Sequence, residues 1–135
     1  AFLLRENPAE LTIRDYGPAV LMVPYFMRRP FDMVLLLKNT RQGALHSLSD
    51  AELTALTRGW HEALKSLHQV MPTIGKEIAY NVVLHNGAGR GFYCEFLPYT
   101  QATGGYEHLG LSICHATPAR AARGLQKTLA RPANP

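Results

Sequence analysis

The chain has 135 residues, 47% of them hydrophobic, which suits a single folded domain with a sizeable core. Its net charge of +4 comes mostly from scattered arginines rather than a basic stripe, so we expect a solvated surface that tolerates a phosphate-bearing ligand, and no nucleic-acid partner. The apolar run Ala19–Met27 is too short to span a membrane, and the two cysteines lack CxxC spacing, which favours reduced thiols in a cytoplasmic protein.

The first elements along the chain are predicted strands. Glu10–Arg14 alternates in polarity and is predicted as a short edge strand, and Asp15–Pro18 carries a turn signal. The apolar runs Ala19–Tyr25 and Asp32–Lys38 follow, and they predict an antiparallel pair with a buried centre. The polar segment Asn39–Ser47 is expected to connect this pair to the next element.

A long amphipathic helix is predicted next. Ser49 and Glu52 fit a capping box, in which each side chain accepts a hydrogen bond from the backbone N–H of the other residue. Apolar residues then recur at three- and four-residue spacing: Leu53, Leu56, Trp60, Leu64, Leu67 and Met71. This spacing predicts about five helical turns, which end at Pro72.

A hairpin is predicted after the helix. Ile78–His85 and Phe92–Leu97 are predicted as its strands, joined by the glycine-rich turn Asn86–Gly91. Pro98 is expected to end the second strand, and Tyr99–Gly105 to form a loop.

The chain is predicted to close with a strand, Leu109–His115, and a short helix, Ala119–Ala130. Thr117 provides the N-cap of this helix and Pro118 its first position. Together the elements predict an α+β fold, with a mostly antiparallel sheet of about five strands, one long helix and a short C-terminal helix.

Candidate ligand-binding residues lie on the predicted hairpin. Because side chains alternate across a strand, Tyr93 and Glu95 are expected to point away from a core that contains Cys94. Asn81 and His85 share one face of the preceding strand, and pairing across the turn would bring His85 near Tyr93 or Glu95. Such a polar patch is typical of ligand sites, and the alternative is a structural histidine–glutamate pair at a sheet edge.

Other patterns carry a weaker signal. The turn Asn86–Gly91 either cradles a phosphate with its backbone amides or is an ordinary hairpin turn. Glu107 follows a pair of glycines and either binds sugar hydroxyls or is a plain loop glutamate. His61 and His68 share a helix face but form no HExxH motif, so we predict no zinc site there. Neither a GxSxG motif nor a convincing cysteine–histidine pair is present in the sequence.

The order of the motifs resembles a known family. The segments YNVVLHNG, FYCEFLP, GGYEHLG and ATPARAARGL, preceded by VPYFMRRPFDMVLLLK, resemble the second half of the galactose-1-phosphate uridylyltransferases in the histidine triad (HIT) superfamily. The resemblance extends from about Ala19 to Leu125. It implies a HIT-like fold for a single domain, residues 1–135, that would be the second half of a larger transferase-like protein.

The resemblance also implies roles for individual residues. His85 corresponds to a histidine that binds a structural metal in some members, Glu95 to a glutamate of the next strand, and Glu107 to a glutamate that contacts hexose hydroxyls. We therefore predict Glu107, Asn81 and Tyr93 as substrate-binding residues, and His85 and Glu95 as metal ligands. Two strand histidines of the family are replaced by Gly91 and Tyr93, so a zinc or iron site would be incomplete.

The nucleophile of the family lies in a His-Pro-His motif of its first half, and this sequence contains no such motif. We therefore expect no catalytic residue in the chain. One hypothesis is a substrate-supporting domain of a nucleotidyltransferase that takes a nucleotide sugar or a sugar phosphate, with the catalytic half elsewhere. The other is a catalytically degenerate HIT-like domain used for ligand binding or dimerisation, as a homodimer or beside a missing N-terminal domain.

Overall fold

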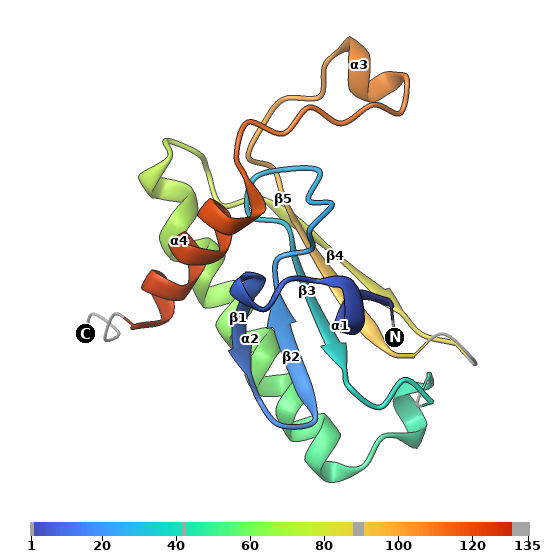
Figure 1. Cartoon of the computed structure of the whole chain (residues 1–135). Coiled ribbons are helices and arrows are strands. Elements are labelled where there is room, and N and C mark those ends of the chain that lie inside the picture. The colour runs from blue at the N-terminus through green and yellow to red at the C-terminus, as the bar shows by residue number, and fades with distance from the viewer. Residues whose placement is uncertain (1, 42, 88–90, 131–135) are drawn as a thin grey trace.

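The computed structural model describes residues 2–41, 43–87 and 91–130 (Figure 1). An antiparallel sheet of five strands has the order β1-β2-β3-β5-β4. The strands are β1 (Thr12–Asp15), β2 (Ala19–Met22), β3 (Met33–Leu37), β4 (Tyr80–His85) and β5 (Tyr93–Pro98). The helices are α1 (Phe2–Glu6), α2 (Asp50–Thr73), α3 (Gly105–His108) and α4 (Pro118–Ala130), with short 3-10 turns at Ala9–Leu11 and Leu45–Ser47.

Helix α2 begins as the sequence predicts. The Ser49 Oγ accepts a hydrogen bond from the Glu52 N–H at 3.3 Å, and the Glu52 carboxylate accepts one from the Ser49 N–H at 2.9 Å. The helix continues one residue past Pro72, and its buried face includes Leu67 and Met71. The capping box and the apolar spacing together fix where this helix starts and which side packs on the sheet.

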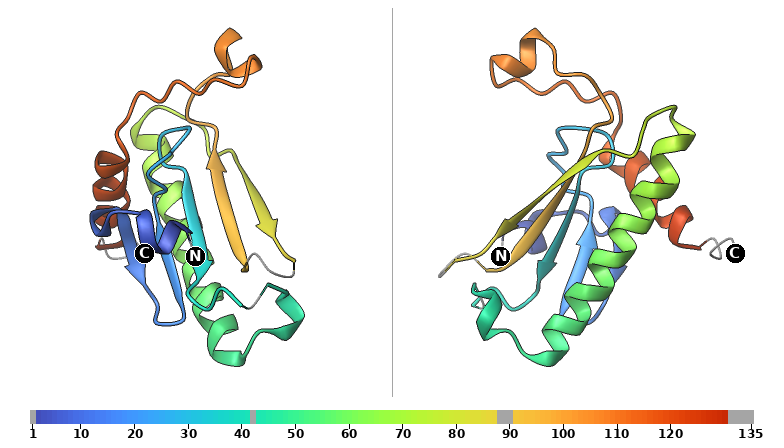
Figure 2. Two further views of the ribbon diagram at one scale, coloured as in Figure 1. Left: turned by 45° about the vertical axis from the view of Figure 1, so that its right-hand side comes forward. Right: turned by 180° about the vertical axis from the view of Figure 1, so that it is seen from behind.

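The inner face of the sheet is covered by helices, and the outer face is covered over β2 and β3 (Figure 2). On the inner face, the long helix α2 and α4 enclose a core that includes Leu21, Leu35 and Phe96. On the outer face, a smaller apolar cluster on β2 and β3 packs against Leu3 and Leu4 of α1. This burial on two sides explains why β2 and β3 are read as continuous apolar runs rather than as alternating strands.

The predicted last strand, Leu109–His115, is wrong. Residues 99–117, which we call the arm, leave the end of β5, form the single turn of α3 and return to α4 (Figure 1). The two sides of the arm are linked by a side chain, with Gln101 Nε2 donating to the Ile113 carbonyl at 2.8 Å. Gly110, at φ 81°, also turns the chain there. Apolar alternation forms a strand only where a partner backbone is available, and no partner strand adjoins 109–115 among the described residues.

Two further expectations concern the glycine-rich turn and membrane-spanning helices. The predicted turn Asn86–Gly91 lies partly outside the described residues, because positions 88–90 are not among them. Along the ranges that the structure does describe, no helix is long and apolar enough to cross a bilayer.

Candidate functional site

A polar cluster lies on the outer face of the β4–β5 hairpin. The register pairs His85 with Tyr93 and Val83 with Glu95. The His85 ring stacks on the Tyr93 ring, with centroids 4.0 Å apart and planes 8° from parallel. Its Nε2 lies 2.7 Å from Glu95 Oε2. The alternation of side chains therefore places these residues together, opposite the buried Cys94, as the sequence indicates.

An arginine from a distant loop completes this cluster. Arg28, in the loop between β2 and β3, places its Nη2 3.5 Å from Glu95 Oε1. The two carboxylate oxygens of Glu95 thus face different partners, His85 on one side and Arg28 on the other. We call Arg28, His85, Tyr93 and Glu95 the outer-face cluster.

The outer-face cluster does not fit a zinc or iron site. The described parts of the chain contain no group of three or more His, Cys, Asp or Glu residues that could hold a metal ion. The Arg28 guanidinium also brings a positive charge to the Glu95 carboxylate, where a cation would have to bind. His85 and Glu95 supply two ligands, fewer than the four that structural zinc usually takes, so we derive no chemistry through a metal.

A polar pocket opens beside this cluster, at the end of β5. It has a volume of about 270 Å³ and is enclosed by the β2–β3 loop, β4, the end of β5 and the arm. Its lining consists of Arg28, Arg29, Asp32, Asn81, Leu97, Tyr99, Gln101, Thr103, Glu107 and Ser112. Arg28 belongs to both the pocket and the outer-face cluster, so the two form one continuous site.

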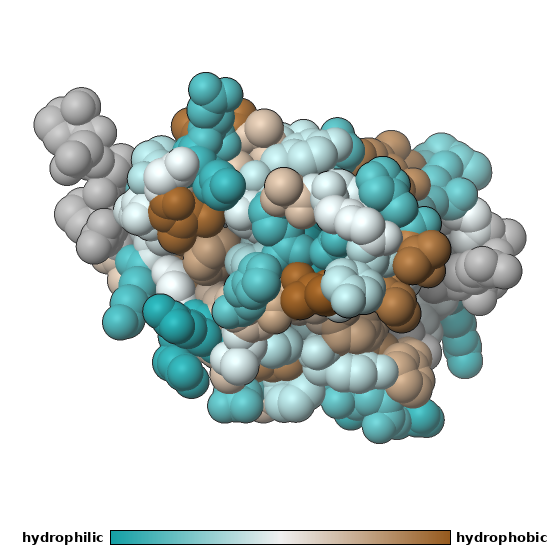
Figure 3. Space-filling view, turned by 90° about the horizontal axis from the view of Figure 1, so that it is seen from above, coloured by the Kyte–Doolittle hydropathy of each residue, from teal (hydrophilic) through white to brown (hydrophobic). Residues whose placement is uncertain are grey.

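A few polar contacts connect the arm to β4 and to the β2–β3 loop. The Thr100 hydroxyl donates to the Pro30 carbonyl at 3.0 Å, and Asn81 Nδ2 donates to the Tyr99 hydroxyl at 2.9 Å. The Arg29 guanidinium lies 5.3 Å from the centre of the Tyr99 ring, a cation–π distance. The surface at the α3 end of the molecule mixes polar and hydrophobic residues (Figure 3). The exposed hydrophobic side chains of the arm include Leu109 and Leu111.

Of the five predicted site residues, Asn81 and Glu107 line this pocket, whereas Tyr93, His85 and Glu95 lie in the adjoining outer-face cluster. Glu107 also caps its own helical turn, because its Oε2 accepts from the Gly104 N–H at 2.9 Å. Backbone hydrogen bonds, from Glu107 itself and from Gly104, hold the pKa of Glu107 below its ordinary value. Glu107 is therefore a carboxylate at neutral pH, with acceptor oxygens at the pocket wall.

Asp32 lies in the pocket wall and was missed at the level of sequence, together with Arg28 and Arg29. Only 3% of its surface is exposed, and its Oδ2 accepts from the N–H groups of Arg28 and Arg29 at 3.2 and 3.1 Å. Burial raises the pKa of Asp32 to about 6, against the opposing effect of these hydrogen bonds. The available signal was an acid at the start of an apolar run, three residues after a pair of arginines.

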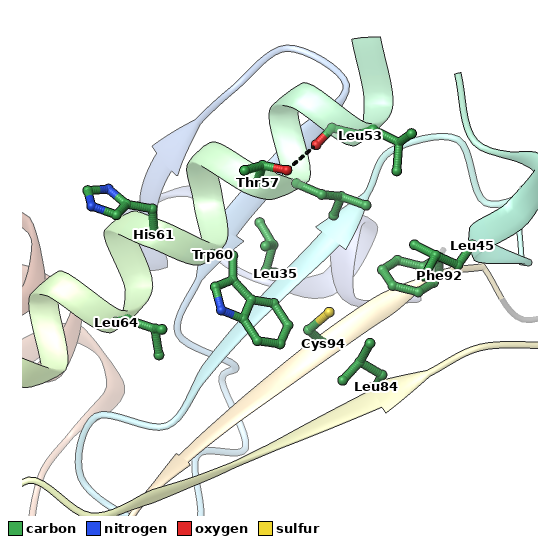
Figure 4. Close-up of a pocket in the computed structure, with 11 residues that line it drawn as sticks. Leu35, Leu45, Leu53, Thr57, Trp60, His61, Leu64, Leu84, Phe92 and Cys94 are labelled. Carbon is green, nitrogen blue, oxygen red and sulfur yellow. Dashed lines mark hydrogen bonds between the residues drawn. The ribbon is translucent and has the colours of Figure 1, made fainter. Parts of the chain in front are cut away.

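A second, apolar pocket lies on the inner face of the hairpin (Figure 4). It has a volume of about 350 Å³, and in Figure 4 the Trp60 indole extends from α2 toward Cys94 and Leu84. Burial raises the pKa of Cys94 to about 12, so its thiol stays neutral and is not an activated nucleophile. The lining consists of Leu35, Leu45, Leu53, Leu56, Thr57, Trp60, His61, Leu64, Leu84, Phe92 and Cys94, with few polar atoms, which favours packing over chemistry.

Solved structures share this fold. A uridylyltransferase superposes with a TM-score of 0.80 at 20% identity, over 93% of this chain and 43% of that one. An ADP-glucose phosphorylase from Arabidopsis thaliana with bound ADP-glucose gives a TM-score of 0.68 at 18% identity, over 87% of this chain and 40% of that one. A HIT-like protein involved in cell-cycle regulation from Bartonella henselae gives 0.63 at 10% identity, over 95% and 93%.

These likenesses confirm the predicted HIT-like α+β fold, the one found in part of the uridylyltransferase chain. The chain spans less than half the length of the uridylyltransferase and of the phosphorylase that it matches. No protein-family model matches the sequence, and no curated protein matches it either.

Proposed function

We propose that this chain is a substrate-supporting domain of a nucleotidyltransferase like the galactose-1-phosphate uridylyltransferases, and that it binds a nucleotide sugar or a sugar phosphate in the polar pocket. The observation that carries the proposal is the convergence of two arginines with Asn81 and Glu107 in one pocket of about 270 Å³. Arginine guanidinium groups suit phosphate oxygens, and amide and carboxylate groups suit sugar hydroxyls. The phosphorylase of similar fold has ADP-glucose bound, which supports this class of ligand.

In this proposal the chain orients the substrate and does not attack it. Transfer of a nucleoside monophosphate through a covalent intermediate needs a nucleophile with a reachable lone pair. His85 is engaged with Glu95 and stacked on Tyr93, which suits a positioning role for the outer-face cluster. The nucleophilic histidine would come from another domain or chain. Direct substrate contact by Tyr93 stays a prediction.

Binding measurements test the proposal. We expect isothermal titration calorimetry to detect UDP-glucose and glucose 1-phosphate, and Arg29→Gln to weaken both because it removes a phosphate-binding charge. Asn81→Ala and Glu107→Gln should weaken binding by about tenfold each, the effect of losing one good hydrogen bond to the ligand. Glu77→Gln, at an exposed position outside the pocket lining, is the matched control. Absence of binding to both compounds would contradict the proposal.

A second candidate function is favoured by the free side of β4. This strand is at the edge of the described sheet; Val83 is exposed on its outer face beside Glu95, and Leu84 is exposed on its inner face, where it lines the apolar pocket. Antiparallel pairing of this edge with the same edge of a second copy would be self-complementary and would cover these side chains. Light scattering should then report a dimer that Leu84→Asp converts to a monomer, and a monomeric wild-type chain would exclude this candidate.

A further inference from the structure

One oxygen of Asp32 is not accounted for by the fold. Asp32 lines the polar pocket, and its Oδ2 accepts two backbone N–H groups, whereas its Oδ1 is buried without a hydrogen-bond partner. A buried acceptor without a partner is unfavourable, and native proteins satisfy most such groups. An acidic side chain with a spare buried oxygen is therefore a feature that needs an explanation.

The local backbone presents this oxygen in a defined direction. Phe31, just before Asp32, has φ 70°, a left-handed conformation that is uncommon for a residue other than glycine and is costly for a bulky side chain. The N–H groups of Arg28 and Arg29 hold Oδ2 in place from the same turn. With one oxygen fixed and the backbone turned, the position of Oδ1 is also set.

The neighbouring charges do not use Oδ1. The Arg28 guanidinium pairs with Glu95 at 3.5 Å, and the Arg29 guanidinium lies over the Tyr99 ring. In the portion of the chain that the structure describes, neither side chain forms an ion pair with Asp32. Both arginines nevertheless line the same pocket as Asp32. A ligand phosphate would therefore meet the guanidinium groups, and a ligand hydrogen-bond donor would meet Asp32 Oδ1.

We propose that Asp32 Oδ1 is a ligand-binding acceptor that takes a hydrogen bond from a sugar hydroxyl, and so selects a sugar phosphate over phosphate alone. This inference rests on the proposed function and names the part of the ligand that the pocket distinguishes. An ionised carboxylate can only accept hydrogen bonds, so it favours a hydroxyl and repels a phosphate oxygen. Arg28 and Arg29 offset that repulsion for a phosphate at their side of the pocket.

The test compares two ligands and two matched substitutions. Asp32→Asn keeps the size of the side chain and one oxygen for the Arg28 and Arg29 N–H groups, and it turns the other oxygen into an NH₂ donor. Asp50→Asn makes the same chemical change at the exposed start of α2, outside the pocket lining. Each protein is titrated by calorimetry with glucose 1-phosphate, galactose 1-phosphate and inorganic phosphate.

We expect Asp32→Asn to weaken binding of at least one hexose phosphate by at least about tenfold, the effect of a hydrogen bond to a charged group. Binding of inorganic phosphate should stay within about twofold or become tighter, because a negative charge is removed. Asp50→Asn should change neither. Unchanged affinity of Asp32→Asn for both hexose phosphates would overturn this inference alone, whereas a wild-type chain that binds no ligand would overturn the proposed function and this inference with it.

A second measurement does not depend on how the variant folds. The wild-type chain is titrated with a series of monodeoxy analogues of the hexose phosphate that binds more tightly. We expect one analogue to bind at least about tenfold more weakly than the parent to the wild-type chain, and also to Glu107→Gln and to Asn81→Ala, because Oδ1 then loses its donor while the hydroxyl contact of Glu107 or Asn81 is already removed. Equal affinity across the whole series would overturn the assignment of a hydroxyl to Asp32.

Discussion

The two sides of β5 differ in what they do. On the inner side, Cys94 and Phe96 are buried, and the Trp60 ring meets the Phe96 ring edge-on at 5.2 Å. On the outer side, Tyr93 and Glu95 stay partly exposed and contact His85 and the Arg28 loop. The comparison shows that alternation gives one strand of six residues a buried core face on one side and a polar cluster on the other.

The largest loss of stability should come from a substitution on the inner side of β5. Phe96 is fully buried, so Phe96→Ala removes a large side chain and leaves a cavity that the surrounding core fills only in part. We expect the free energy of unfolding to fall by about 3–5 kcal/mol in urea denaturation. Leu111→Ala, at a position in the arm with 58% exposure, is the control and should cost less than about 0.5 kcal/mol. Similar losses of stability for Phe96→Ala and Leu111→Ala would contradict the assignment of stability to the inner side of β5.

A substitution at Asp32 should change the free energy of unfolding by an intermediate amount, and in the stabilising direction. Burial raises its pKa from 3.8 to about 6, so between these pH values the folded state binds more protons than the unfolded state. The free energy of unfolding should therefore fall as the pH rises through this window. At pH 7, Asp32→Asn should stabilise the chain by roughly 1–3 kcal/mol.

Urea denaturation of both proteins at pH 4.0 and pH 7.0 measures this effect. The gain from Asp32→Asn should be present at pH 7.0 and small at pH 4.0, where the wild-type carboxyl is already protonated in the folded state. Asp50→Asn is the control for the loss of one carboxylate. A destabilised Asp32→Asn variant at pH 7.0 would show that the charge at this position contributes to stability.

The smallest change in stability should come from a substitution on the outer side of β5. Glu95 is 19% exposed and Arg28 54%, and their closest atoms are 3.5 Å apart, so solvent screens this pair. Glu95→Gln keeps the shape of the side chain, and we expect it to cost at most about 1 kcal/mol of stability. A loss as large as that of Phe96→Ala would mean that the outer-face cluster holds the fold together.

The sequence was sufficient for features that depend on near neighbours. Ser49 and Glu52 are three residues apart, so the start of α2 could be predicted from their pattern alone. The contact between His85 and Glu95 followed from alternation on two strands joined by a short turn. In both cases the residues concerned are close in sequence, and the geometry of one regular element or hairpin fixes how they meet.

Features that depend on tertiary placement could not be predicted. Arg28 meets Glu95 although 67 positions separate them, because β3 pairs with β5 and brings the preceding loop to that strand. The apolar alternation of Leu109–His115 predicted a strand, but that segment lies in the arm beyond the end of β5, where it meets no free strand edge of the described sheet. The polar pocket combines both situations: Asn81 and Glu107, which line it, were singled out from the sequence, whereas Asp32 was not.

The position of β5 in the sheet has a consequence for folding. The strands β1, β2 and β3 follow one another as a meander, whereas β4, in the part of the chain that the structure describes, pairs with the sheet only through β5. A nascent chain that has reached Leu84 can therefore complete the meander and α2, but β4 still lacks its native partner β5. Only after Pro98 has been synthesised can the hairpin dock on β3, so the hairpin is the last part of the sheet to assemble, and the polar pocket is complete only once the arm as far as Ser112 has followed.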